Sequence, residues 1–526
     1  MFRGRRLRDA LGVRARRGGR RIAPIEPAAP DLGRQALRSE ARGVAREGVL
    51  FLAGGIAGKA AEFFFRRKLS VELGPSEWGV YSLGLSVMAV ASAFVQGGFE
   101  QGLAHHVALW RADGRRALGV GRAAFRAVLV LSLLASAALV AAAEPLARIL
   151  SIEGGAWCLR AFGALVPAVA LADLAASGLY GFGEGRAKGL LQDMGAGMLL
   201  LVAAYLLSAL GTGTPVFVAA HGAVLAAVAV LMVHLLSRRL GGPVWAGDTA
   251  GTWRVLLSFS WPLSVRPFLE TLPFWLGLFL VGATRGASEA GVFSVALLVA
   301  SPLRYLQLPM IALYMPLASR FAHGAGEGEL ERLHRAAARW SAIAVAPAAI
   351  FLVLYAGEVL GWAFREEYVA GARALAILAA GIAACALVGP SQTLLVALGR
   401  TRLDLANRVP AALATVVLCF VLAPRLGGTG AAIALAAGDI LVRYLAAIQV
   451  ARIRSFLPAD PRSLAALALF GASIFALDRA FRAAGLLDSS SGWALLLAAW
   501  AAGTIALLAA TGALRELAAW RRSGTH

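Results

Sequence analysis

The sequence has only three cysteines in 526 residues, Cys158, Cys385 and Cys419. They lie far apart in the chain, so the sequence predicts neither a disulfide framework nor a cysteine metal site. Long polar loops are also missing, because the outward segments between apolar runs have at most about a dozen residues. The sequence contains no His-Glu-x-x-His and no Ser-His-Asp arrangement. We therefore expect a protein that is not an enzyme and that has no metal and no cofactor.

The chain has instead a large apolar content, with 59% hydrophobic residues. About 20 apolar residues are needed to cross a bilayer as a helix. Runs of this length recur along the whole chain and exclude a soluble globular protein. The sequence predicts fourteen spans, at roughly 49–70, 79–108, 118–142, 157–182, 190–210, 215–236, 254–282, 290–318, 340–362, 374–398, 404–424, 429–450, 463–481 and 491–514.

The apolar runs belong to a duplicated unit. Residues 74–82, Gly-Pro-Ser-Glu-Trp-Gly-Val-Tyr-Ser, match residues 286–294, Gly-Ala-Ser-Glu-Ala-Gly-Val-Phe-Ser, at six of nine positions and at a spacing of 212. A second pair, Gly185-Arg186 and Gly399-Arg400, recurs at a spacing of 214. Two matches at nearly one spacing indicate a duplicated unit of about 210 residues. Paired membrane repeats are typical of alternating-access transporters.

The expected fold is an all-α polytopic membrane protein with about fourteen transmembrane helices, two pseudo-symmetric six-helix lobes and a C-terminal helix pair. The expected organisation is a disordered basic cytoplasmic arm (1–47), an N-lobe of helices 1–6 (48–239), a cytoplasmic linker (240–253), a C-lobe of helices 7–12 (254–451), helices 13–14 (462–515) and a cytoplasmic tail (516–526).

The net charge of +21 is explained by membrane topology. With both termini in the cytoplasm, residues 1–47 carry 13 Arg, and the other inward segments carry 23 basic residues against 11 in the outward segments. This is the positive-inside distribution. It requires no nucleic acid as a partner. For the basic arm, attraction to anionic membrane lipid is sufficient.

Ionisable residues inside spans are costly and mark candidate sites. The first span holds Lys59 and Glu62, the seventh holds Arg266 and Glu270, and the eighth holds Arg304. Two interpretations remain open for these five. In the first interpretation they line a central, net-cationic cavity for an anionic headgroup, where the planar fork of Arg suits phosphate. In the second they only pair with one another and hold helices together.

Other polar residues lie in otherwise apolar helices. Glu62, Glu270 and His221 are candidates for ion coupling, and the sequence does not separate coupling from pairing. For Arg443, Asp173, Asp193 and Asp439 the structural interpretation is favoured. Prolines bend helices, and they interrupt the seventh and eighth spans as either hinges or ordinary kinks: Pro262, Pro267, Pro273, Pro302, Pro309 and Pro316.

The stretch from Leu73 to Ser82, with the later Gly97-Gly98-Phe99, resembles the opening of Wzx-type polysaccharide flippases of the multidrug/oligosaccharidyl-lipid/polysaccharide (MOP) exporter superfamily. Members typically run Leu-Gly-Pro-x-x-Phe/Tyr-Gly-x-Tyr-Ser after the first helix, and Trp78 takes the aromatic place here. The resemblance covers about 49–450. It implies a carrier, in the bacterial cytoplasmic (inner) membrane, that moves an undecaprenyl-pyrophosphate-linked oligosaccharide to the outer leaflet. Polysaccharide assembly proteins are then candidate partners.

Three alternatives remain. A cation-coupled multidrug antiporter of the same superfamily would depend on a cavity acid and not on Arg266 or Arg304. A lipid II flippase also has fourteen spans, but its early Arg-Asp and Pro-Asn motifs are not found in this chain. A membrane enzyme such as a glycan polymerase would need a larger outward loop. The flippase for lipid-linked oligosaccharide is the leading hypothesis.

Overall fold

The computed structural model describes residues 30–152, 154–249, 251–263, 265–324, 327–454, 461–488 and 490–512. The chain forms two compact units, residues 1–48 and 49–526. Of the first unit, only the start of one helix lies among the described residues. All further statements on packing concern the second unit.

The described residues are almost entirely helical, and no strand occurs among them. The helices of the first half are α1 (Pro30–Gln96), α2 (Phe99–Leu109), α3 (Gly114–Ala141), α4 (Ala143–Ile149), α5 (Ala156–Ala164), α6 (Val166–Gly181), the π-helix η2 (Ala187–Gly195), α7 (Ala196–Ala209) and α8 (Thr214–Leu240). Those of the second half are α9 (Trp253–Leu263), α10 (Val265–Arg285), α11 (Ala287–Tyr305), α12 (Leu308–Gly324), α13 (Glu327–Leu354), α14 (Ala356–Ala363), the short η3 (Glu366–Gly371), α15 (Ala372–Leu387), α16 (Ser391–Ala397) and α17 (Thr401–Arg454). The chain ends with α18 (Pro461–Ala483), η4 (Leu486–Asp488) and α19 (Ser490–Ala510).

The first helix starts earlier than the sequence suggested. Residues 30–47 are helical in α1, although they belong to the stretch for which a disordered arm was expected. Pro30 takes the first helical position, where its missing N–H costs nothing, and residues 31–47 are rich in Ala, Arg and Glu, which favour helix. Residues 1–29 of the expected arm lie outside the described residues.

Eleven of the described helices or continuous helical stretches are long and apolar enough to cross a membrane. Two of these are bent, α1 at Gly74 and α17 at Gly427. Helix α17 contains the eleventh and twelfth predicted spans, whereas α1 contains the first and only part of the second, which is broken after Gln96 and continues in α2. The seventh predicted span falls on α9 and α10. The prediction of an all-α, multi-pass membrane protein is therefore confirmed.

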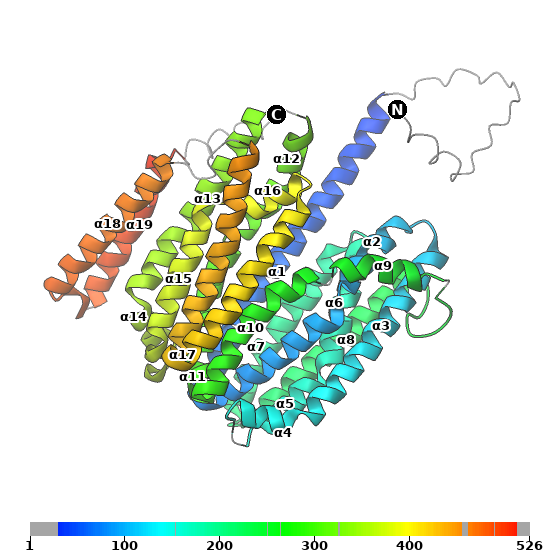
Figure 1. Cartoon of the computed structure of the whole chain (residues 1–526), viewed down its shortest axis with the longest axis horizontal. Helices are drawn as coiled ribbons and strands as arrows, with labels where there is room; N and C mark the ends of the chain where they lie inside the picture. Colours follow the sequence, from blue (N-terminus) through cyan, green and yellow to red (C-terminus); the bar gives the residue numbers. More distant parts are fainter. Residues whose placement is uncertain are drawn as a thin grey trace, which may run out of the picture. The chain divides into compact units, whose positions relative to one another are not determined.

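The helices pack mainly within their own half of the sequence (Figure 1). In the first half α6 contacts α2, α3 and α8, and in the second half α17 contacts α10, α15 and α16. Helices α18 and α19 lie side by side, and both contact α13. One element departs from this division, because α9 packs on α2 and α3. The segment at which the second lobe was expected to begin therefore contacts the first half.

Matching glycines make the same turn in both halves. Gly74 has φ 72° and ψ 174°, and Gly286 has φ 87° and ψ 173°. Only glycine adopts this region readily. The second matched pair needs a correction in register. The Gly399 N–H bonds to Val396 O and the next N–H to Leu395 O, and the same pattern at the end of α6 belongs to Gly183, not to Gly185. Because a glycine after the last helical turn is what ends each helix, Gly183 is the residue equivalent to Gly399, and the spacing between these two is 216.

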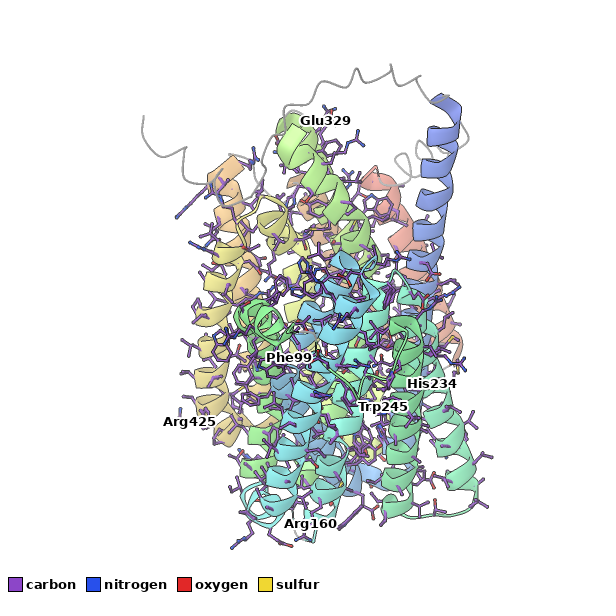
Figure 2. The ribbon with its side chains drawn as sticks, turned by 90° about the vertical axis from the view of Figure 1, so that its right-hand side faces the viewer. Phe99, Arg160, His234, Trp245, Glu329 and Arg425 are labelled. Carbon is purple, nitrogen blue, oxygen red and sulfur yellow. The ribbon has the colours of Figure 1, made fainter. Side chains whose placement is uncertain are left out.

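The helix bundle has two ends with segments from many helices. Figure 2 shows Glu329, in the first turn of α13, and Arg160, in α5, at opposite ends of the bundle. The turn at Gly74 follows the first predicted span, and the turn at Gly427 follows the eleventh. With the predicted orientation, these turns lie at the outer end.

Candidate functional site

The repeated motif, residues 74–82 and 286–294, is where the two halves of the chain touch. A Cβ atom on Gly79 would lie 1.8 Å from Ala287 O, and a Cβ atom on Gly291 would lie 2.0 Å from Pro75 O. The two contacts are equivalent by the spacing of 212: position 79 matches 291 and position 75 matches 287, so each half contributes the same glycine and the same carbonyl. Helices α1 and α11 therefore cross backbone against backbone, around a local two-fold axis.

The last residue of the motif lies on this axis. Ser82 Oγ and Ser294 Oγ are 3.1 Å apart and come from matching positions 212 residues apart. Ser294 Oγ also donates to Gly291 O at 2.8 Å, so the proton between the two serines comes from Ser82. A contact between two matching residues is what a local two-fold axis produces.

The glutamate of each motif binds the last helix of its own half. Thr214 Oγ1, at the start of α8, donates to the Glu77 carboxylate. The Gly428 N–H, just after the bend of α17, donates to Glu289 Oε1 at 3.1 Å. Carboxylates at helix N-termini are stabilised by the unpaired N–H groups and the helix dipole. Each motif is thus fastened to its own half.

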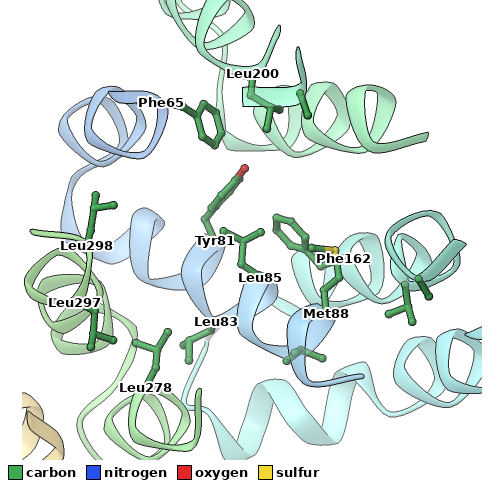
Figure 3. Packing of buried hydrophobic residues seen from close by; sticks show 14 of the residues in the cluster. Phe65, Tyr81, Leu83, Leu85, Met88, Phe162, Leu200, Leu278, Leu297 and Leu298 are labelled. Atoms are coloured by element: carbon green, nitrogen blue, oxygen red, sulfur yellow. The ribbon is translucent and has the colours of Figure 1, made fainter. Parts of the chain in front are cut away.

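A buried aromatic cluster surrounds the first motif (Figure 3). The Tyr81 hydroxyl is hydrogen-bonded to His221 Nδ1, and Phe65 and Phe162 meet the imidazole edge-on at centroid distances of 5.7 and 5.8 Å. Leu83, two residues along the same helix, is next to Leu278 of α10 in the same view. The structure therefore places His221, a candidate for ion coupling, in an apolar cluster with a tyrosine as its partner.

The predicted pair Lys59 and Glu62 forms part of a triad on α1. Lys59 Nζ is 2.7 Å from Glu62 Oε2, and the other carboxylate oxygen accepts from Arg66 Nη2. The triad has one surplus positive charge. Lys59 Nζ also lies 6.0 Å from the centre of the Tyr305 ring of α11, within the range of a cation–π interaction. This contact brings the triad next to the second half of the chain.

Arg304, beside Tyr305, is paired with a residue that sequence reasoning assigned to structure. Its Nη2 donates to Asp439 Oδ2 of α17, and both side chains remain about one-third exposed, at 33% and 32%. Arg443 lies four residues beyond Asp439, on the same side of α17. This second group again combines two cations with one anion.

The other two predicted residues, Arg266 and Glu270, lie on α10. Their side chains are outside the described residues, so their roles stay predictions. The predicted interruption of the eighth span is confirmed, because α11 ends at Tyr305 and α12 begins at Leu308. Arg304 therefore lies in the last turn before the break.

A second polar cluster lies within the first half. Asp173 of α6 accepts from Gln96 Nε2 at 2.8 Å and from Gln192 Nε2 at 2.5 Å. Gln192 belongs to the π-helix η2. Gln96 and Gln192 were not among the polar residues singled out from the sequence. Only Asp173, as an aspartate in an apolar helix, indicated this cluster. Among the described residues, no group of His, Cys, Asp and Glu has a metal-binding arrangement.

The fold is that of MOP superfamily transporters. The structure is similar to the lipid II flippase MurJ (TM-score 0.67, 10% identity, 90% of this chain and 99% of that chain). It is also similar to an inward-facing multidrug resistance MATE family transporter (TM-score 0.62, 15% identity, 76% and 94%). A MOP superfamily transporter from Pyrococcus furiosus matches with a TM-score of 0.57 (15% identity, 78% and 95%). At these identities the likeness establishes the fold alone.

The sequence itself identifies the family. Residues 72–372, more than half of the chain, match the family described as "Polysaccharide biosynthesis protein". The chain therefore belongs to the polysaccharide biosynthesis protein family. No curated protein matches the sequence. The match begins just before the first motif and includes the second.

Proposed function

We propose that the protein is a flippase that moves a lipid-linked oligosaccharide from the inner to the outer leaflet of the bacterial cytoplasmic membrane by alternating access. The family match over residues 72–372 carries this proposal, because it connects a transporter fold with polysaccharide biosynthesis. The headgroup would be an undecaprenyl-pyrophosphate-linked glycan. No covalent bond is made or broken in such a transfer.

The charges near the meeting of the two halves support an anionic cargo. Lys59 and Arg66 exceed Glu62 by one charge, and Arg304 and Arg443 exceed Asp439 by one. A pyrophosphate group is an anion that Arg binds with two parallel hydrogen bonds. Each half then supplies one unbalanced cation, and the carboxylates hold the cations in place between transport cycles.

The proposal is tested by deleting the gene and measuring, with side-specific labels, where lipid-linked oligosaccharides accumulate. We expect accumulation on the cytoplasmic leaflet and loss of a surface polysaccharide, with both defects corrected by the wild-type gene. Unchanged distribution of lipid-linked sugars across the leaflets would refute the proposal. Genes encoding Arg304→Ala and Arg332→Ala serve as test and control, since Arg332 is a 76% exposed residue far along the chain from the motifs.

Two proteins of the same fold suggest alternative functions, and the gene-deletion strain also distinguishes these from the proposed one. A cation-coupled drug antiporter is favoured by the partly exposed Glu62, 31% accessible at mid-helix. It predicts sensitivity to cationic drugs and loss of function on Glu62→Gln, with Arg304→Ala active. A lipid II flippase predicts lysis and accumulation of peptidoglycan precursors on depletion.

A further inference from the structure

A cavity of about 660 Å³ lies beside the crossing of α1 and α11. Its polar lining comes from both halves of the chain: Ser76, Arg285, Ser288, Glu289, Glu367 and Thr429. A cavity of this size is in the range that holds a small organic ligand. It is separate from the charged groups described above, because Arg304 lies 16 residues beyond Ser288 on α11, about 24 Å along the helix axis. In the predicted orientation the cavity belongs to the outer end of the bundle.

Hydrogen bonds next to the cavity hold its walls in place. Tyr368 Oη donates to Ser70 O at 2.8 Å, which ties η3 to α1 of the first half. Arg285 Nη2 donates to Arg425 O at 2.6 Å and connects the end of α10 with α17. A ligand that enters a cavity with fixed walls immobilises little of the protein, so less of the binding free energy is lost in ordering the site.

The lining combines hydrogen-bond donors and acceptors. Its three hydroxyl groups both donate and accept, the Arg285 guanidinium donates, and the Glu289 and Glu367 carboxylates accept. A phosphate group would face two carboxylates here, and a metal cation would face a guanidinium. The anion that helix N-termini favour is already supplied by Glu289, which accepts the Gly428 N–H at 3.1 Å. The lining therefore suits an uncharged ligand with several hydroxyl groups.

We propose that this cavity is an outer binding site for neutral sugar residues. It rests on the proposed function only for the origin of the sugars, which are those of the exported glycan. Sugar hydroxyls donate to the carboxylates and accept from the guanidinium, so both kinds of lining group find partners. Glu367 is exposed and is reached first from the solution, whereas Glu289 and Thr429 are half-buried and lie deeper.

The site is complete only while the two halves touch. Pro75 and Ser76 belong to the first half, and the other lining residues belong to the second. A sugar in the cavity therefore binds the conformation that contains the crossing better than one in which the halves are parted, and it shifts the population toward the former. Glycan that accumulates outside the cell slows further transport in this way.

The experiment uses the full-length protein in detergent and ligand-observed NMR with a panel of neutral monosaccharides and disaccharides: glucose, galactose, mannose, rhamnose and N-acetylglucosamine. Inorganic pyrophosphate and Ca²⁺ are the charged probes. Glu367→Ala removes an acceptor from the lining, and Ala370→Trp fills the cavity from an exposed position on its edge. Glu366→Ala is the matched control, because Glu366 is the neighbouring exposed acid of η3 and is not part of the lining.

We expect at least one neutral sugar to bind. Its Kd should rise about tenfold or more in Glu367→Ala, because a hydrogen bond to a charged group contributes about that factor. Binding should be lost in Ala370→Trp and unchanged in Glu366→Ala. If no sugar of the panel binds, or if wild type and both cavity variants bind equally, the site is refuted. Pyrophosphate or Ca²⁺ bound in place of a sugar, and lost in Glu367→Ala, would make the cavity an ion site and overturn the assignment.

A second measurement follows the conformation. A membrane-impermeant maleimide added from outside labels Lys59→Cys in a chain whose three native cysteines are replaced by Ala. Lys59 is 46% exposed and lies next to Tyr305 of the other half. The sugar that binds should slow this labelling, and it should have no effect when Ala370→Trp is also present. Equal labelling rates with and without the sugar would refute the connection between the site and the crossing.

The gene deletion separates the outcome for the cavity from the outcome for the proposed function. If lipid-linked sugars keep their normal distribution across the leaflets while a neutral sugar binds in the cavity, the site is retained and the proposed cargo is refuted. If lipid-linked oligosaccharides accumulate on the cytoplasmic leaflet while no neutral sugar binds, the flippase is retained and the outer site is refuted.

Discussion

The crossing of α1 and α11 makes a quantitative prediction for Gly79→Ala. The new methyl carbon would lie 1.8 Å from Ala287 O and 2.6 Å from Ala287 C, both backbone atoms that cannot turn away. The two helices must therefore move apart. Overpacking of this kind costs about 1–3 kcal/mol, and loss of the Ser82–Ser294 bond adds about 1 kcal/mol. The conformation that contains the crossing should lose about 2–4 kcal/mol relative to one in which the halves are parted.

This loss corresponds to a shift of roughly 30- to 1,000-fold in the ratio of the two conformations, because about 1.4 kcal/mol is a factor of ten. The assay is external labelling of Lys59→Cys, whose rate should rise in Gly79→Ala. Gly114→Ala is the matched control, since a Cβ atom there meets nothing within 4 Å and the residue opens α3. Immunoblots of membranes confirm equal insertion of all variants.

The two-fold relation sharpens the test. Gly291→Ala would place its methyl 2.0 Å from Pro75 O and should raise labelling to a similar extent. The double variant should have less than the summed effect, because one separation of the helices relieves both clashes. Unchanged labelling in both single variants would refute the reasoning. An effect from only one glycine would refute the symmetric crossing.

The remaining predictions concern the charged residues and the aromatic cluster. Arg266→Ala and Arg304→Ala should each abolish export with the protein still inserted, while Lys at either position should retain part of the export if only positive potential is needed. Normal export in both Ala variants would refute the cationic cavity. Arg332→Ala, in an exposed ion pair of little energetic value, should export normally. Tyr81→Phe should lower the free energy of unfolding in detergent by about 1 kcal/mol, because it removes the bond to His221; an unchanged thermal midpoint would contradict the contribution of that bond.

Much of the architecture could be predicted because the membrane restricts the choice. Apolar runs of about 20 residues have to be helices when no water is present to bind the backbone. The duplication was inferred from two matched pairs of segments, and the matching φ and ψ of Gly74 and Gly286 are the structural counterpart of the first pair. Neither inference needed knowledge of tertiary contacts.

The partners of the charged residues depended on tertiary contacts and were missed. Asp439 lies 135 residues from Arg304, and no local pattern connects the two. The pairing of Arg66 with Glu62 could have been predicted, since Arg66 lies four residues beyond Glu62 on the same helix. The helix continues past Arg66 to the bend at Gly74, so Arg66 lies inside α1.

The differences between the two copies of the motif follow from which positions face the axis. Gly79 and Gly291 each lie against the backbone of the opposite helix, and Ser82 meets Ser294, so a larger side chain at any of these positions would push the two helices apart. Pro75 and Ala287 differ freely, because they contribute only a carbonyl oxygen to the contact. The other two differing positions are buried in the hydrophobic core that the two halves share. Trp78 stacks on Tyr81 at 5.4 Å in the first half, whereas the second half has the smaller buried pair Ala290 and Phe293 at these positions. The crossing therefore restricts the size of the side chains at its own positions, while the differing positions contribute only backbone to it or lie in the core. A motif with this pattern of identity is expected of a contact between the halves and not of a site that binds cargo within one half.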